Sequence, residues 1–200
     1  MTRILCIGGP GVLSTGTLAA LAERGEEVAL LTHTDKHLQD VPLGVEMLRG
    51  DRDDPATIRR ALDAFRPQVV VDFVLFRPEQ AKALIPLLAG RVEQYVFVST
   101  VDVYGYPLSR LPLRESDPRM PPNCDYAAFK RQCEELFGAA GQADLPLTVV
   151  RPAGAGPLLL TAESHDPDAT AVVELYGPNQ RSGGAVRQVW RKLRFRTDET

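Results

Sequence analysis

Cysteine is scarce in this chain of 200 residues, which contains only Cys6, Cys124 and Cys133. Their spacing forms neither a CxxC pair nor another metal-binding pattern. No hydrophobic run reaches the roughly 18 residues of a membrane-spanning helix, and the opening MTRILCIGG holds no hydrophobic segment of signal-peptide length. We therefore expect a soluble cytoplasmic protein with reduced thiols and no membrane partner, in which Cys6 is a core residue.

An excess of positive charge is also missing, because 23 Lys and Arg against 26 Asp and Glu give a net charge of -3. No general basic field points to nucleic acid, although the segment VRQVWRKLRFR near the C-terminus is locally basic. Such a short tail could bind RNA but is more often a solvated helix, so we expect no nucleic-acid partner. The length and a hydrophobic fraction of 44% suit one domain with a buried core.

Short β-branched runs alternate along the chain with longer segments of helical period. They predict strands over residues 3–8, 27–32, 44–51, 68–74, 94–100 and 146–152. Helices are predicted over 14–25, 54–65 and 78–90, with a kink or break at Pro86, and around Tyr126. This order is typical of an α/β protein with a Rossmann-like, doubly wound parallel sheet. We assign residues 1–157 to this Rossmann-like domain and 158–200 to a short irregular tail that could hold a basic helix.

The loop CIGGPGVLSTG follows the first strand and opens the first helix, where doubly wound folds bind a dinucleotide. Gly8 and Gly11 keep a spacing that permits a tight turn and close approach to a pyrophosphate. Ser14 replaces the third glycine of the motif and is small enough for close helix–strand packing. The free N–H groups at the start of the helix would favour the phosphates, so the loop predicts an NAD or NADP site.

The end of the second strand bears on the choice between these two cofactors. A carboxylate there would bind the 2′-hydroxyl of NAD, but this chain has Thr32 followed by HTDKH. His33 and Lys36 could instead contact a 2′-phosphate, which gives a weak preference for NADP. The spacing of His33 and His37 could suit a metal, but no third ligand is in view, so we expect no metal site.

The stretch CDYAAFKRQCEEL places Tyr126 and Lys130 four residues apart, on one face of a predicted helix. An ammonium near the phenol would lower its pKa and make Tyr126 a general acid or base near neutral pH. The alternative is a chance pair on a solvated helix face. Spacing alone leaves both interpretations open.

Three motifs, GGPGVLS, STVDVYG and YAAFK, together resemble the extended short-chain dehydrogenase/reductase family, and most closely its NAD-dependent epimerase/dehydratase group. The resemblance covers residues 1 to about 157. It implies an NAD(P)-dependent oxidoreductase or epimerase that couples proton transfer by a Tyr–Lys pair to hydride transfer. Its small-molecule substrate would be a nucleotide sugar or a similar compound with a hydroxyl or carbonyl group. It also implies a homodimer formed through the helices that flank strands four and five.

The same resemblance implies roles for single residues. Thr100, four positions before Tyr104, would hydrogen-bond the reacting oxygen, unless it is an ordinary strand-end threonine. Tyr126 would be the acid/base, and Lys130 would bind the nicotinamide ribose. Further cofactor contacts are implied at Asp51, to the adenine amine, at Phe73, and at Arg77. Cys124 has no histidine nearby in the sequence and is interpreted as a loop thiol.

Two segments depart from the family pattern. The loop DFVLFRPE lacks the small Ala-Gly pair that relatives have near the cofactor, and RPAGAGP is followed by only 43 residues that do not resemble the family's substrate lobe. The sequence therefore describes an atypical, C-terminally short member whose substrate lobe is largely missing. A second hypothesis follows, in which the chain is a non-catalytic NAD(P)-binding module that regulates or binds RNA or protein.

Overall fold

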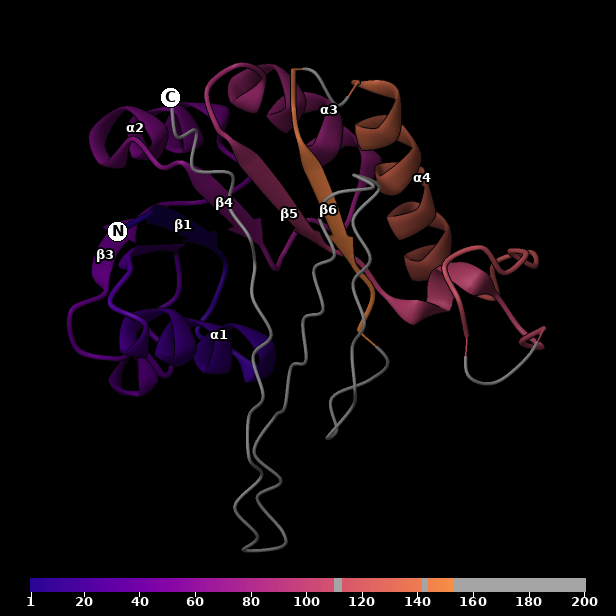
Figure 1. Cartoon of the computed structure of the whole chain (residues 1–200), viewed down its shortest axis with the longest axis horizontal. Helices are drawn as coiled ribbons and strands as arrows, with labels where there is room; N and C mark the ends of the chain where they lie inside the picture. Colours follow the sequence, from indigo (N-terminus) through magenta and orange to yellow (C-terminus); the bar gives the residue numbers. More distant parts are fainter. Residues whose placement is uncertain (110–112, 142–143, 153–200) are drawn as a thin grey trace, which may run out of the picture.

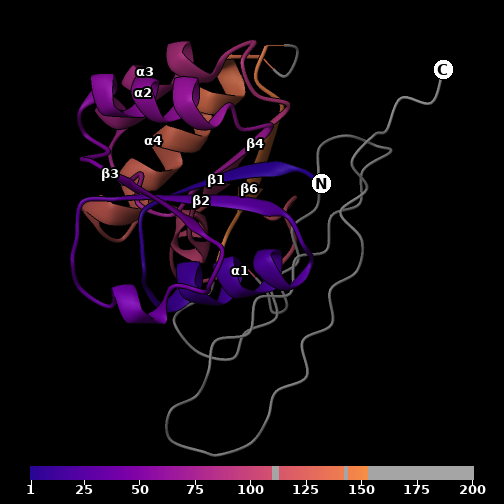
Figure 2. The same ribbon diagram turned by 90° about the vertical axis from the view of Figure 1, so that its left-hand side faces the viewer.

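A six-stranded parallel sheet with helices on both faces forms the described part of the chain. The computed structural model describes residues 1–109, 113–141 and 144–152. The strands lie in the order β3-β2-β1-β4-β5-β6 and every neighbouring pair is parallel. Helix α1 covers one face, and α2, α3 and α4 cover the other (Figures 1 and 2). The order of the strands reverses between β1 and β4, which creates the crevice where open α/β sheets bind ligands.

The elements alternate as the sequence predicted. The strands are β1 (Arg3–Ile7), β2 (Glu27–Thr32), β3 (Glu46–Arg49), β4 (Val69–Asp72), β5 (Gln94–Val98) and β6 (Leu147–Val150). The helices are α1 (Val12–Glu23), α2 (Pro55–Phe65), α3 (Pro78–Leu88) and α4 (Asp125–Ala139), with 3-10 turns η1 (Leu38–Asp40) and η2 (Val101–Tyr104). The predicted Rossmann-like, doubly wound sheet is confirmed.

Local differences from the prediction have simple causes. Helix α2 begins as expected, because the Asp54 side chain accepts a hydrogen bond from the Ala56 amide and Pro55 occupies the first turn. Helix α3 is not interrupted at Pro86 but continues through it to Leu88. Strand β2 has the predicted bounds, and the other five strands are shorter than predicted. After β4, for example, the apolar residues Phe73 and Val74 lie in the loop beyond the sheet edge.

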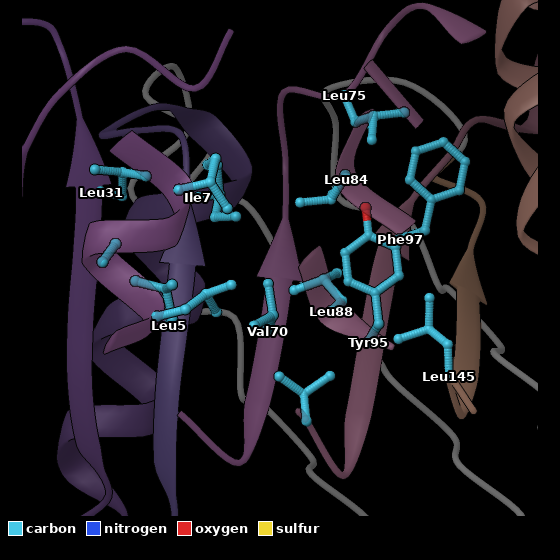
Figure 3. Packing of buried hydrophobic residues seen from close by; sticks show 14 of the residues in the cluster. Leu5, Ile7, Leu31, Val70, Leu75, Leu84, Leu88, Tyr95, Phe97 and Leu145 are labelled. Atoms are coloured by element: carbon cyan, nitrogen blue, oxygen red, sulfur yellow. The ribbon is translucent and has the colours of Figure 1, made fainter. Parts of the chain in front are cut away.

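Two apolar layers fill the space on either side of the sheet. The layer under α2, α3 and α4 contains Leu5, Val70, Tyr95 and Phe97 with Leu84 and Leu88 of α3 (Figure 3). The layer under α1 contains Ile4, Cys6, Leu30, Val71 and Leu18. Cys6 is completely buried, as predicted, and burial raises the pKa of its thiol to about 12. Side chains of the four inner strands are therefore covered on both faces, which explains their continuous apolar runs.

The proposed boundary at residue 157 and the basic segment of the tail lie outside the described residues. Within the ranges that are described, no helix is both long and apolar enough to cross a membrane.

Candidate active site

The loop between β1 and α1 is shaped by Gly8 and Gly9, both with positive φ (+88° and +129°). A Cβ atom on Gly8 would lie 2.4 Å from a methyl group of Val74, and one on Gly9 would lie 2.4 Å from Ser14 Oγ. Gly11 differs, because its φ of -162° is ordinary extended backbone and a Cβ there would come no closer than 3.7 Å to Ser14 Oγ. Sequence analysis therefore missed Gly9, and the fold itself does not require glycine at position 11.

The first turn of α1 offers a place for a dinucleotide pyrophosphate. The N-cap residue Gly11 has no side chain to cap this helix, so within the described part of the chain its first amide N–H groups are left for a ligand. Ser14 is buried, 2% exposed, and donates to the Gly11 carbonyl at 3.4 Å. Its hydroxyl lies against Gly9 and Gly11 of the loop. These residues fit a bound pyrophosphate.

Lys130 lies on α4, almost fully buried at 1% exposure. Its Nζ donates to the Leu75 carbonyl at 2.6 Å and to the Val98 carbonyl at 2.7 Å, so it joins the loop after β4 to the end of β5. The rings of Phe76 and Phe97 each lie 4.8 Å from Nζ. Burial lowers the pKa of Lys130 to about 8.

Tyr126 occupies the first turn of α4 and keeps 41% of its surface exposed. Its ring centroid lies 6.3 Å from that of Phe76 and 5.9 Å from Lys130 Nζ. Partial burial raises the pKa of Tyr126, a hydrogen bond with Thr100 works in the opposite direction, and the charge of Asp102 raises the pKa further. This direction is opposite to the one expected from the Tyr126–Lys130 spacing, because the Lys130 amine is turned toward two backbone carbonyls.

Thr100 follows β5 and is 6% exposed. Its hydroxyl caps η2 by accepting from the Asp102 amide at 3.3 Å, and it donates to Asp102 Oδ2 at 3.1 Å. Thr100 therefore caps the turn after β5, as an ordinary strand-end threonine does, and its contact with a reacting oxygen stays a prediction. Asp102, inside the STVDVYG motif, was not singled out from the sequence.

The other predicted cofactor residues lie further along the same edge of the sheet. His33 is exposed after β2, and Asp51 is exposed after β3 with its carboxylate accepting from the Asp53 amide at 2.9 Å. Phe73 follows β4 and packs partly against the core under α1. Arg77 is exposed before α3 and lines a cleft of about 450 Å³ between α2 and α3, apart from the group around Lys130.

A buried ion pair lies beneath this edge. Arg52 Nη2 donates to Asp72 Oδ2 at 2.7 Å, and the Asp72 side chain is 0% exposed. The second Asp72 oxygen accepts from the Val74 amide at 3.0 Å. The Asp72 charge opposes the fall in the pKa of Lys130 and so helps to keep its amine protonated. Sequence analysis interpreted Asp72 only as part of a strand.

A second polar network, centred on Glu134, includes Ser99, the residue before Thr100. Glu134, one turn after Lys130 on α4, accepts from Ser99 Oγ at 2.6 Å and from Arg151 Nε at 2.9 Å and Nη2 at 2.8 Å. Arg119 also donates to Glu134, at 2.7 Å. These cations and the Ser99 hydroxyl lower the pKa of Glu134 although its burial opposes the change. Sequence analysis missed this network. The signals in the sequence that could have indicated it are Glu134, four residues after Lys130, and Arg151, directly after the last strand.

No three His, Cys, Asp or Glu side chains in residues 1–109, 113–141 and 144–152 are grouped so that they could hold a metal ion. The described site instead brings together the glycine loop, the ends of β4 and β5, and the first turns of α4. The groups available for binding or proton transfer are the hydroxyls of Thr100 and Tyr126, the buried amine of Lys130 and the backbone amides at the start of α1.

Comparison with known proteins decides the family. A sequence model of the NAD-dependent epimerase/dehydratase family matches residues 4–176, which is most of the chain. The chain belongs to the NAD-dependent epimerase/dehydratase family. The match runs on past residue 157, where the resemblance was expected to end, and the predicted family is confirmed.

Individual members of the epimerase/dehydratase family are moderately similar. A UDP-glucose 4-epimerase of Halalkalibacterium halodurans is 28% identical over 83% of this chain and 55% of its own length. A 2′-dehydrokanamycin reductase of Streptomyces kanamyceticus is 31% identical over 69% of this chain and 38% of its own. The chain thus spans about half the length of the first relative and less of the second.

Solved structures of this family share the fold. The UDP-glucose 4-epimerase of Brucella ovis in complex with NAD superposes with a TM-score of 0.67 at 20% identity, over 76% of this chain and 51% of that one. The Thermus thermophilus UDP-glucose 4-epimerase, also complexed with NAD, gives 0.63 at 26% identity, over 74% and 54%.

Proposed function

We propose that this chain carries the cofactor site and proton-transfer residues of an NAD(P)-dependent oxidoreductase or epimerase. The observation that supports this most directly is that the Tyr126 ring lies 5.9 Å from the buried Lys130 Nζ. Lys130 binds the Leu75 carbonyl in the loop after β4, and the preceding residue, Val74, packs against Gly8 of the glycine loop. A chance Tyr–Lys pair on a solvated helix would not bury its lysine to 1% exposure. The family match adds the expectation of a nicotinamide cofactor.

The residues divide the work as follows. The N-terminus of α1, with Gly8 and Gly11, binds the pyrophosphate, and the cofactor supplies or accepts a hydride. Tyr126 exchanges a proton with the hydroxyl or carbonyl oxygen of the substrate. Lys130 uses two of its three N–H groups on backbone carbonyls and has one left for a ribose hydroxyl.

The proposal extends to the substrate class and the cofactor. A nucleotide sugar is favoured because several similar proteins are UDP-glucose 4-epimerases. The exposed His33 and Lys36 after β2 favour a 2′-phosphate and hence NADP, whereas the similar structures were solved with NAD. We also propose a cytoplasmic location, and a homodimer through α3 and α4, where Phe129 keeps 38% of its surface exposed.

The first experiment is a fluorescence titration of the 200-residue chain with NADPH and with NADH, together with thermal melting. Saturable binding and a raised Tm are expected, with the tighter Kd for NADPH. A well-folded protein that binds neither would contradict the proposal. With an active substrate in hand, Tyr126→Phe should lower kcat by a factor on the order of 10² to 10⁴ and leave the cofactor Kd unchanged.

A second candidate uses the same site for binding alone, as a regulatory module. It is favoured by the two carbonyls that already hold the Lys130 amine and by the raised pKa of Tyr126. This alternative would be supported if the chain binds a dinucleotide but turns over no sugar, sugar nucleotide or ketone, and if Tyr126→Phe leaves dinucleotide binding unchanged.

A further inference from the structure

The turn after β4 is held by a buried carboxylate. Asp72 is the last residue of the strand, and its side chain is 0% exposed. Its Oδ1 atom accepts from the Val74 amide at 3.0 Å, and such a bond from a side chain to the amide two residues on forms an Asx-turn. The place of the Asp72 carboxylate therefore fixes the backbone of Val74 and of Leu75 after it.

Arg52, in the loop after β3, holds the other oxygen of this carboxylate. Its Nη2 atom donates to Asp72 Oδ2 at 2.7 Å, and its own side chain is only 9% exposed. The Tyr95 hydroxyl lies 3.5 Å from the same oxygen, too far for a strong hydrogen bond. Arg52 is thus the counter-charge that lets the carboxylate stay buried and face the turn.

Two contacts of the candidate site depend on this turn. The methyl groups of Val74 lie against Gly8, where an added Cβ atom would come within 2.4 Å of one of them. The Leu75 carbonyl accepts from Lys130 Nζ at 2.6 Å, one of the two hydrogen bonds that hold this buried amine. Movement of the turn would therefore remove an acceptor from Lys130 and change the packing against the glycine loop.

The ion pair itself is a poor source of stability. Arg52 Nε is buried and has no hydrogen-bond partner among the described residues. The cost of removing two charges from water commonly cancels their attraction, so replacing a buried pair by apolar side chains is often neutral for folding. The main effect of the Arg52–Asp72 pair is then geometric, because it ties the loop after β3 to the turn after β4.

We propose that Asp72, held by Arg52, is a positioning residue that fixes the turn after β4 and so keeps the Leu75 carbonyl on the Lys130 amine. This inference rests on the proposed function, in which Lys130 must stay beside Tyr126 with one N–H group left for the cofactor ribose. Asp72 acts through the backbone of the turn and not by contact with cofactor or substrate.

The test follows the accessibility of Lys130 and needs no cofactor. Lysines of the folded protein are methylated with formaldehyde and a borohydride reagent, and mass spectrometry of the peptides gives the rate at Lys130 relative to the exposed Lys82. In wild type Lys130 should react slowly, because it is almost fully buried. Arg52→Met leaves the Asp72 carboxylate without its counter-charge and should raise the relative rate by about tenfold or more.

Two double variants without a buried charge separate the turn from general damage. Arg52→Met/Asp72→Asn keeps an oxygen that can accept from the Val74 amide, whereas Arg52→Met/Asp72→Leu has the same net charge and no acceptor. The relative rate at Lys130 should stay within about twofold of wild type in the first and rise by about tenfold or more in the second. Cys133, completely buried one turn after Lys130, should stay unreactive toward a thiol reagent in both. This comparison stands even if Arg52→Met alone fails to fold.

Three results of the labelling would overturn the proposal. They are a protected Lys130 in every variant, equal release of Lys130 in the two double variants, and release of Lys130 together with a reactive Cys133. If wild type binds NADPH, the Leu double variant should weaken the Kd by about tenfold and the Asn double variant by less than about twofold, and an unchanged Kd in the Leu variant would also overturn the proposal. A wild type that binds no dinucleotide would refute the proposed function and leave the labelling result unchanged.

Discussion

Lys130 allows a quantitative test of how burial controls the charge of the site. Its pKa falls from the ordinary 10.5 to about 8. Because the folded protein releases this proton more readily than the unfolded chain, the ammonium costs stability below pH 8. The cost is relieved as the pH rises from about 8 to about 10.5, and the full difference corresponds to about 3 kcal/mol.

The perturbation is Lys130→Met, which keeps an unbranched apolar stem but has no ionisable group. The assay is urea unfolding of both proteins at a series of pH values from about 7 to about 9.5. The free energy of unfolding of wild type, minus that of the variant, should rise by about 2 kcal/mol over this range. Cys6 and Tyr95 are buried and have raised pKa values, so their ionisation in the unfolded chain lowers the free energy of unfolding at high pH. This effect is the same in both proteins and cancels in the difference between them.

A difference that stays flat would refute the reasoning. It would mean that the carbonyls of Leu75 and Val98 stabilise the ammonium as well as water does, so that burial does not lower the pKa. In that case the Lys130 ammonium would cost no stability below pH 8, and the free energies of unfolding of wild type and Lys130→Met would differ by an amount that does not change with pH.

Two further predictions concern the frame of the site. Gly8→Ala should lower the free energy of unfolding by about 2 kcal/mol, because Gly8 has a positive φ and a Cβ there would clash with Val74. Gly11→Ala should change the free energy of unfolding by less than about 0.5 kcal/mol but should weaken NADPH binding. Equal melting temperatures of the two variants would count against this difference. Glu134→Gln should cost about 3 kcal/mol in chemical denaturation, since it leaves the guanidinium of Arg151 without its buried counter-charge, and a loss below 1 kcal/mol would show that water replaces the carboxylate.

The fold could be predicted because its signals are local. The glycine loop, the Asp54 cap and the alternation of apolar strands with helices each depend on residues close together in the sequence. The position of Tyr126 and Lys130 on one helix followed from their spacing in the same way.

The electrostatics of the site could not be predicted in this way. The pKa of Tyr126 depends on where the Lys130 amine points, and two backbone carbonyls, one in the loop after β4 and one at the end of β5, decide that. A backbone carbonyl has no signature in a sequence. Glu134 and Arg151, likewise, are an ordinary helix residue and an ordinary strand-end residue until the chain is folded.

The Glu134–Arg151 pair also bears on how the molecule opens. Strand β6 has four residues and pairs only with β5 in the described sheet, so it would be expected to fray early. Its end is fastened to α4 by the bidentate contact between Arg151 and Glu134. Local unfolding of this strand must therefore break a buried ion pair on the helix that carries Tyr126. Amide protons of β6 and of α4 should accordingly exchange with solvent as one cooperative unit, slower than those of an isolated edge strand.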